Sequence, residues 1–313
     1  MEFRTIIPIQ QLPELDYNHH YVLLGSCFAE YMSMYLSDYR FSVTVNPYGV
    51  LFSPTAIVRA LREAAYGLVH ENQVRQVNEQ WVYLFAHSDW NQLSREDLLA
   101  VQKQQRSVLR QSIQQAKWVQ ITLGTSWVYR DLATDQFVAN CHKIPQNQFA
   151  KQLLSVDEVA DQLRKMEYYI GEINPKAEII FTISPVRHAK DGWIENQQSK
   201  AHLIAGLHQY RKDKPGIHYF PSYEMVMDEL RDYRFYERDM MHPNEQARAY
   251  IWERFCQASI TESTYQLMNE VEWINRAIAH RPFNENTQAH QQFLQQVETR
   301  IAALQTKLPH VQF

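Results

Sequence analysis

The chain has 313 residues, of which 45% are hydrophobic and 21% are charged, and its formal net charge at pH 7 is −4. This composition excludes a disordered or fibrous protein, and the length suffices for one large domain or two small ones. Because the charge provides no basic field that would bind phosphate backbones, we expect no nucleic acid partner. No stretch of about 18 apolar residues occurs, so no membrane span is predicted.

Glycine and cysteine are both scarce. The 8 glycines fall singly, so neither G-x-G-x-x-G nor G-x-x-x-x-G-K-[ST] occurs, and a phosphate-binding loop of these types is excluded. The 3 cysteines form no C-x-x-C pair and no H-E-x-x-H is present, so we expect neither disulfides nor a metal site. Since the N-terminus shows no signal-peptide pattern, we expect a cytoplasmic protein.

Short apolar runs alternate with longer stretches of helical periodicity, which is typical of βαβ units and of a parallel sheet covered on both faces. In chain order the pattern predicts a strand at 21–24, a helix at 28–37, a strand at 41–45, a helix at 54–66, a peripheral strand at 80–85, a helix at 95–115, a strand at 118–123, a β-hairpin at 128–140, a helix at 156–173, a strand at 178–183, a helix at 195–211, a strand at 217–220 and a helix at 244–258. Ser53 before Pro54, and Ser155 with Glu158, are typical helix starts.

Two further helices are predicted at 262–280 and 287–308. We therefore divide the chain into an α/β domain, residues 1–260, and a helical extension packed on it, residues 261–313. The last helix carries an apolar stripe at helical spacing, formed by Phe293, Val297, Ile301, Leu304 and Leu308. This stripe either packs on its own chain or forms the surface of a homodimer.

Polar residues follow each predicted core strand. In an open parallel sheet, ligands bind beyond the carboxyl ends of the strands, so these segments are the candidate site. They read Gly-Ser-Cys-Phe-Ala-Glu at 25–30, Asn-Pro-Tyr-Gly at 46–49, Gly-Thr-Ser at 124–126, Ser-Pro-Val-Arg-His at 184–188 and Asp-Met-Met-His-Pro-Asn at 239–244.

This set of motifs resembles the GSCFA family of the SGNH (GDSL-like) hydrolase superfamily, and the likeness extends to Ala-Asn-Cys-His-Lys at 139–143 and His-Arg-Pro-Phe-Asn at 280–284. The resemblance implies a three-layer, flavodoxin-like α/β fold with a five-stranded sheet of order 2-1-3-4-5. It also implies ester hydrolysis or O-acyl transfer, for which we expect an acylated carbohydrate or another small ester as substrate. Hydrolysis needs no cofactor, whereas a transferase would use an acyl donor such as acetyl-CoA.

The nucleophile has two candidates. When the superfamily's G-D-S pattern is laid over this chain, Ser26 takes the aspartate position and Cys27 takes the position of the attacking serine. A thiol fits there, because the N-terminus of the following helix would lower its pKa. If the alignment shifts by one residue, Ser26 attacks instead. In a third interpretation, Cys27 is a buried small hydrophobe.

Asp239 and His242 match the superfamily's D-x-x-H block. The resemblance makes His242 the general base and acid and Asp239 the residue that orients it. We then expect a His242 ring nitrogen within about 4 Å of the nucleophile, with Asp239 on the other nitrogen. The alternative is a helix N-cap beside an exposed histidine.

The resemblance assigns the oxyanion donors to the Cys27 amide, to Gly49 and to an asparagine whose position is occupied here by Ser126. Asn46 and Asn140 are candidate replacements for this asparagine. Arg187 and His188 follow the fourth core strand and either bind an anionic group of the substrate or form surface ion pairs. Asn140 and His142 are further candidates for substrate binding. The unusual nucleophile and the missing asparagine leave open a catalytically inert SGNH-like protein that binds a carbohydrate or another ligand.

Overall fold

The computed structural model describes residues 5–284 and 287–313. Its central sheet consists of five parallel strands, which are β1 (His20–Gly25), β2 (Ser42–Val45), β5 (Ala116–Leu123), β9 (Glu178–Ile183) and β10 (Ile217–Tyr219). They lie in the order β2-β1-β5-β9-β10, and all neighbours are parallel. Numbered along the chain, this is the predicted order 2-1-3-4-5, and the three-layer α/β fold is confirmed.

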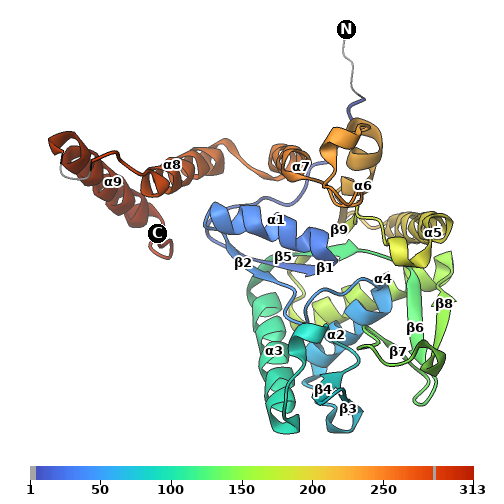
Figure 1. The fold of residues 1–313 in the computed structure, drawn as a ribbon. Coiled ribbons are helices and arrows are strands. Elements are labelled where there is room, and N and C mark those ends of the chain that lie inside the picture. The colour runs from blue at the N-terminus through green and yellow to red at the C-terminus, as the bar shows by residue number, and fades with distance from the viewer. Residues whose placement is uncertain (1–4, 285–286) are drawn as a thin grey trace.

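Helices cover both faces of this sheet (Figure 1). One face packs against α1 (Cys27–Asp38) and α7 (Glu245–Ser259). The other packs against α2 (Pro54–Tyr66), α3 (Arg95–Gln115), α4 (Val156–Ile173) and α5 (Trp193–Arg211). The predicted start signals are confirmed, because Ser53 caps α2 before Pro54 and Ser155 forms a capping box with Glu158 in α4.

Each core strand supplies apolar side chains to both faces, because successive residues of a strand point to opposite sides of the sheet. Val22, Ile121 and Phe181 pack against the face covered by α2 to α5. Leu23, Trp118 and Ile180 of the same three strands belong to the cluster on the other face. The carboxyl ends of the strands therefore meet along one edge between two helical layers.

Two small antiparallel sheets surround this core. The predicted hairpin is formed by β6 (Trp127–Asp131) and β7 (Gln136–Val138), and a third strand, β8 (Phe149–Leu153), pairs with β6. The predicted peripheral strand is β4 (Gln80–Tyr83), which pairs with β3 (Val74–Val77). We did not predict β8, whose sequence Phe-Ala-Lys-Gln-Leu lacks the β-branched residues that favour strands.

Short helical turns connect the larger elements. They are η1 (Glu71–Gln73), η2 (Ser88–Trp90), η3 (Gln146–Gln148), η4 (Ala189–Asp191), α6 (Ser222–Glu224), the π-helical turn η5 (Met225–Glu229) and η6 (Tyr233–Phe235). The predicted ends of the main helices differ from the observed ends by only one or two residues in most cases. One difference concerns the site, because α1 begins at Cys27 and not at residue 28.

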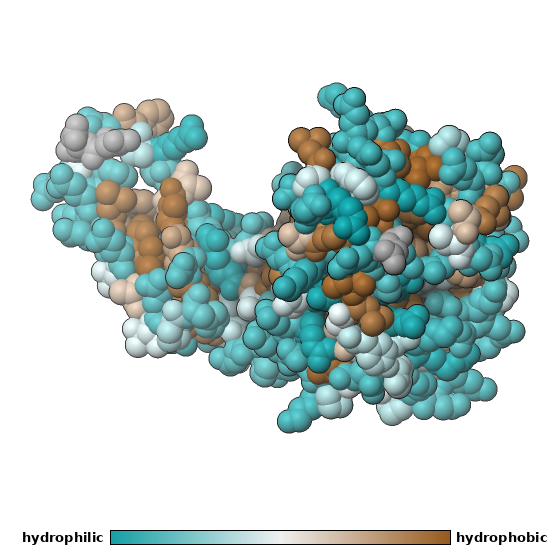
Figure 2. Space-filling model, turned by 90° about the horizontal axis from the view of Figure 1, so that it is seen from below, coloured by the Kyte–Doolittle hydropathy of each residue, from teal (hydrophilic) through white to brown (hydrophobic). Residues whose placement is uncertain are grey.

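The C-terminal extension forms a helical lobe of α8 (Glu262–Ala279) and α9 (Gln288–Lys307) beside the main body (Figures 1 and 2). In the apolar stripe of α9, Val297, Leu304 and Leu308 are buried within the chain. Asn275 of α8 donates to the Asp38 carbonyl at 2.6 Å, at the end of α1. Part of the stripe thus packs on its own chain, while the homodimer stays a prediction.

Residues before β1 connect the two ends of the α/β domain. The Leu12 amide donates to the Ala258 carbonyl at 2.9 Å, and the Leu15 amide donates to the Ser259 carbonyl at 2.7 Å. The extension therefore leaves the α/β domain beside the segment that enters it. Within residues 5–284 and 287–313, no helix combines the length and apolar character needed to cross a membrane.

Gly25 ends β1 with φ +123°, and a Cβ there would lie 2.1 Å from the Thr122 carbonyl oxygen of β5. We therefore expect Gly25→Ala to lower the free energy of unfolding by about 2 kcal/mol or more, measured by chemical denaturation. The control is Gly171→Ala in α4, where an added Cβ meets no atom within 4 Å and should stabilise the helix by roughly 0.5–1 kcal/mol. Equal stability of the two variants would contradict the claim that β1 and β5 approach closely.

Candidate active site

The end of β1 places Cys27 at the first position of α1. The Ser26 amide donates to the Thr122 carbonyl of β5 at 3.1 Å, and α1 starts at the next residue. Ser26 is the N-cap: its hydroxyl oxygen accepts the Phe28 amide at 3.4 Å, and the residue is 1% exposed. Capping occupies the Ser26 oxygen, whereas the Cys27 side chain is partly accessible.

His242 lies on the loop that enters α7 and faces Cys27. The Cys27 Sγ is 3.8 Å from His242 Nε2, within the distance expected for a nucleophile and its base. His242 Nδ1 lies 2.5 Å from Asp239 Oδ2. Because a carboxylate only accepts hydrogen bonds, this contact places the ring proton on Nδ1 and leaves Nε2 free to accept a proton from the thiol.

Asp239 holds this loop as well as the imidazole. Its Oδ1 accepts the backbone amides of Met241 at 2.9 Å and of His242 at 3.0 Å. These amides, with the His242 ring, lower the pKa of Asp239 to about 2, so it is ionised throughout the neutral range. The alternative that Asp239 caps α7 is wrong, because Asn244 is the N-cap of that helix.

The start of α1 lowers the pKa of the Cys27 thiol as predicted, but the overall shift is upward. Burial raises the pKa of Cys27 to about 11, and the nearby Glu30 carboxylate adds to the shift. The buried Lys200 side chain and the amides at the start of α1 act in the opposite direction but do not outweigh burial. Cys27 is therefore a neutral thiol at pH 7.

Lys200 is a fully buried lysine close to this site, and the sequence analysis did not identify it. Its Nζ donates to the Gly124 carbonyl at 2.7 Å and to the Ser184 carbonyl at 2.6 Å, which joins the ends of β5 and β9. Burial, with a contribution from Arg187, lowers the pKa of Lys200 to about 7. A neutral amine keeps two N–H donors, which matches these two carbonyl acceptors.

A signal for Lys200 was present in the sequence. Asn196, Lys200, Leu203 and Leu207 recur at helical spacing along α5, and all four are buried. A lysine in register with Leu203 and Leu207 on one helical face indicates a buried amine that needs polar partners.

The candidate oxyanion donors differ in availability. The Gly49 amide donates to the Asn46 carbonyl at 2.7 Å, so it serves a turn and corrects the expectation for Gly49. Asn46 Oδ1 accepts the Gly25 amide at 2.8 Å, whereas its Nδ2 is buried without a hydrogen-bond partner within the described part of the chain. Asn46 thus presents a free donor next to the end of β1.

Ser126 does not replace the expected asparagine. Its hydroxyl donates to the Ser199 carbonyl at 3.0 Å, and its amide donates to Ser199 Oγ at 2.7 Å. The residue is fully buried between β5 and α5. Its only hydroxyl proton is therefore used to dock α5, which corrects the expectation that Ser126 stabilises an oxyanion.

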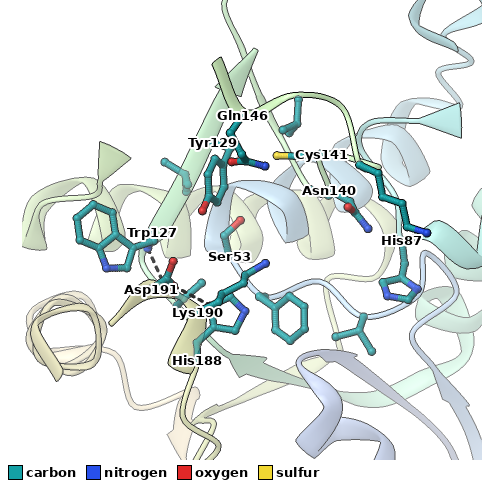
Figure 3. A pocket seen from close by; sticks show the side chains of 17 residues that line it. Ser53, His87, Trp127, Tyr129, Asn140, Cys141, Gln146, His188, Lys190 and Asp191 are labelled. Atoms are coloured by element: carbon teal, nitrogen blue, oxygen red, sulfur yellow. Dashed lines mark hydrogen bonds and ion pairs between the residues drawn. The ribbon is translucent and has the colours of Figure 1, made fainter. Parts of the chain in front are cut away.

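A pocket of about 570 Å³ opens beyond the same strand ends (Figure 3). Its walls come from the β2–α2 connection, β6, the segment after β7 and the loop after β9, and they include Asn140 and His188. His188 lines the pocket, and its Nδ1 lies 2.7 Å from Asp191 Oδ2, so its ring is paired with a carboxylate of the same loop. Cys27 and His242 are not among the residues that line the pocket.

The segment 51–52 connects the pocket to the strand ends. The Leu51 amide donates to the Gly25 carbonyl at 2.9 Å, and the Phe52 carbonyl accepts the amides of Gly124 and Thr125. Phe52 also lines the pocket. This short segment is therefore bonded to the end of β1 and also borders the pocket.

Two predicted binding residues lie outside this pocket. His142 is 6% exposed, and its Nε2 lies 3.0 Å from the Tyr83 carbonyl, so it is a buried anchor and not a ligand-binding side chain. Arg187 donates to Gln197 at 2.5 Å and lines a second cavity of about 560 Å³ beside Tyr236 and Met240. The four predicted binding residues are therefore divided among three environments.

Comparison with known proteins gives two family matches. The model of the GSCFA family matches residues 20–255, and the model of the GSCFA domain protein, C-terminal domain, matches residues 271–313. No curated protein matches the chain. Among solved structures, the chain is similar to a Clostridium thermocellum family 3 carbohydrate esterase, with 10% sequence identity and a TM-score of 0.35, over 84% of this chain and 99% of that chain.

The raised pKa of Cys27 predicts how its reactivity changes with pH. We expect the rate of alkylation of Cys27 by iodoacetamide to rise about tenfold per pH unit from pH 7 to pH 9, without a plateau, because only the thiolate reacts. Peptide mass spectrometry distinguishes Cys27 from Cys141 and Cys256, and N-acetylcysteine treated in parallel calibrates the reagent. A plateau at or below pH 7 would show a preformed thiolate and contradict this assignment.

The lowered pKa of Lys200 predicts that the free energy of unfolding depends on pH. Its pKa is about 7 in the folded chain and near 10.5 when unfolded, so between these values the unfolded chain binds more protons. The contribution of Lys200 to the free energy of unfolding therefore increases from pH 7 to pH 10 and is lost as the pH falls through 7. Urea denaturation should show a weaker increase with pH in Lys200→Met than in the unmodified chain.

The matched control for this prediction is Lys212→Met, which removes an exposed lysine after the end of α5. This variant should keep the pH dependence of the unmodified chain. Loss of the two carbonyl contacts in Lys200→Met lowers stability at every pH. The test is therefore the change in the slope of the free energy of unfolding against pH. Parallel curves for Lys200→Met and the unmodified chain would refute the lowered pKa.

Proposed function

Since the chain belongs to the GSCFA family, we propose that it is an SGNH-like enzyme that transfers acyl groups from esters through a Cys27–His242–Asp239 triad. The observation that carries this proposal is the alignment of three groups, with Cys27 Sγ 3.8 Å from Nε2 of a histidine whose Nδ1 contacts a carboxylate. The substrate that we propose is an acylated carbohydrate or another small ester. Water is the acceptor in a hydrolase, and a second alcohol is the acceptor in an O-acyltransferase.

The first half-reaction forms a thioester. His242 Nε2 removes the thiol proton as Cys27 Sγ attacks the ester carbonyl, because the raised pKa leaves no preformed thiolate. The tetrahedral intermediate collapses by breaking the bond to the alcohol oxygen. His242 returns its proton to this oxygen, and Asp239 stabilises the imidazolium in between.

The second half-reaction releases the acyl group. His242 Nε2 takes a proton from water or from an acceptor alcohol, whose oxygen attacks the thioester carbonyl. The intermediate collapses by breaking the carbon–sulfur bond, and the proton returns to the Cys27 sulfur. The products are a carboxylic acid or a new ester, and the enzyme regains its starting state.

The negative oxygen of both intermediates needs hydrogen-bond donors. The Cys27 amide suits this role, because the first amide of a helix has no intrahelical acceptor. Asn46 Nδ2 is the second donor that we propose, since it is buried, unpaired within the described residues and next to the end of β1. Each such donor typically lowers the activation free energy by about 3 kcal/mol.

Substitution of the triad tests the proposal with 4-nitrophenyl acetate as a general ester probe. We expect Cys27→Ala to lower kcat/KM roughly 10³-fold or more and His242→Ala to lower it about 10²–10⁴-fold, because each residue acts on the reacting atoms. Mass spectrometry should find one acetyl group on the Cys27 peptide during turnover. It should find none in the Cys27→Ala variant.

The control variant is Ser26→Gly, because glycine is nearly as good an N-cap as serine and keeps α1 in place. It should retain most of the activity and the acetylated Cys27 peptide. Activity in Cys27→Ala together with an inactive Ser26→Gly would instead identify Ser26 as the nucleophile. Equal rates in the unmodified chain and His242→Ala, with no acylated peptide, would favour the inert binding protein and refute the proposal.

A further inference from the structure

The pocket beyond the strand ends combines aromatic walls with basic side chains. Phe52, Trp127 and Tyr129 line it, and Lys143 and Lys190 extend into the same space from two different loops. Figure 3 shows the Lys190 side chain reaching into the middle of the pocket. Its volume of about 570 Å³ is in the range of small-molecule binding sites.

The single carboxylate of this pocket is already neutralised. The Asp191 side chain is 1% exposed and lies 2.8 Å from Lys151 Nζ and 2.7 Å from His188 Nδ1. Burial alone would raise the pKa of Asp191, but the contacts with His188 and Lys151 lower it overall. Asp191 thus organises the loop after β9 and does not repel an anionic ligand.

The two lysines, by contrast, have no acidic partner. Among the ion pairs of residues 5–284 and 287–313, none includes Lys143 or Lys190, and both side chains are exposed. The chain as a whole carries a net charge of −4. Unpaired positive charge in a pocket of an acidic protein indicates an anionic ligand.

The position of Lys143 is fixed by the backbone. His142 and Lys143 have φ values of 46° and 61°, an unusual conformation for residues other than glycine. The turn is held because the His142 amide donates to Asn140 Oδ1 at 2.9 Å and the buried His142 ring contacts the Tyr83 carbonyl. Such strain persists where the surroundings enforce it, which is common at binding sites.

We propose that this pocket binds a sugar that carries a carboxylate or a phosphate, with Lys143 and Lys190 on the acidic group and Trp127 and Tyr129 against the ring. Lysine suits both anions, and aromatic faces suit sugar rings. The inference deepens the proposed function, because it makes the substrate of the triad an ester of an acidic carbohydrate. Binding of the acidic sugar does not depend on the proposed chemistry, since Cys27 and His242 do not line the pocket.

The experiment is isothermal titration of the full chain with D-glucuronate, D-glucose 6-phosphate and D-glucose. We expect millimolar or tighter binding of at least one acidic sugar, no binding of glucose, and weaker binding as sodium chloride is added. The difference in affinity between D-glucuronate and D-glucose 6-phosphate then shows which acidic group the pocket prefers. No binding of either acidic sugar, or equal binding of glucose, would overturn the proposal.

Variants locate the site within the molecule. Lys143→Gln and Lys190→Gln should each weaken binding several-fold, and the double variant roughly tenfold or more, because a charge-assisted contact is lost each time. Lys176→Gln, an exposed lysine outside the pocket, is the matched control and should bind as the unmodified chain does. Unchanged affinity in the double variant would refute this site.

Cys27→Ala separates the two proposals. It should bind the acidic sugar with unchanged affinity even though it is inactive, since the thiol is outside the pocket. If the chain binds the sugar but forms no acylated Cys27, the pocket stands and the proposed chemistry fails. If Cys27 is acylated but no acidic sugar binds, the chemistry stands and the pocket assignment fails.

Discussion

The close contact between the end of β1 and the middle of the sheet is the constraint on which the candidate site depends. Gly25 allows β1 to approach the Thr122 carbonyl of β5 more closely than a side chain would permit. The next amide, that of Ser26, then bonds to that carbonyl, and α1 can begin at Cys27. A different end to β1 would rotate the first turn of α1 and move the thiol away from His242, so the position of the Cys27 thiol is set by backbone packing.

The interior of the site favours neutral groups, and its outer side carries the fixed charge. Burial raises the pKa of the Cys27 thiol and lowers the pKa of the Lys200 amine, so both shifts favour the uncharged form. Asp239 lies at the more exposed end, where backbone amides keep it ionised. The site therefore combines inner groups that burial shifts toward the uncharged form with an ionised carboxylate at its more exposed end.

Local patterns predicted the elements well, because the period of apolar residues and the capping signals at Ser53 and Ser155 are properties of neighbouring residues. The order of the strands came from a family resemblance, since pairing between distant strands leaves little local trace. The errors have the same cause. Ser126 is occupied by Ser199, which is 73 positions away in sequence. The pKa of Cys27 follows from burial under packed helices. Gly49 is the exception, because the turn that occupies its amide is local and closes on the Asn46 carbonyl.

Cys27 and His242 are separated by 215 positions, and the segment before β1 is bonded through Leu12 and Leu15 to the end of α7. The pairing of thiol and imidazole therefore closes a loop that contains nearly the whole α/β domain, and contacts of such long range form late in folding. During synthesis Cys27 leaves the ribosome long before His242 does. A partly made chain then carries a cysteine without its imidazole partner, and the pair forms only after the segment that leads into α7 has been made.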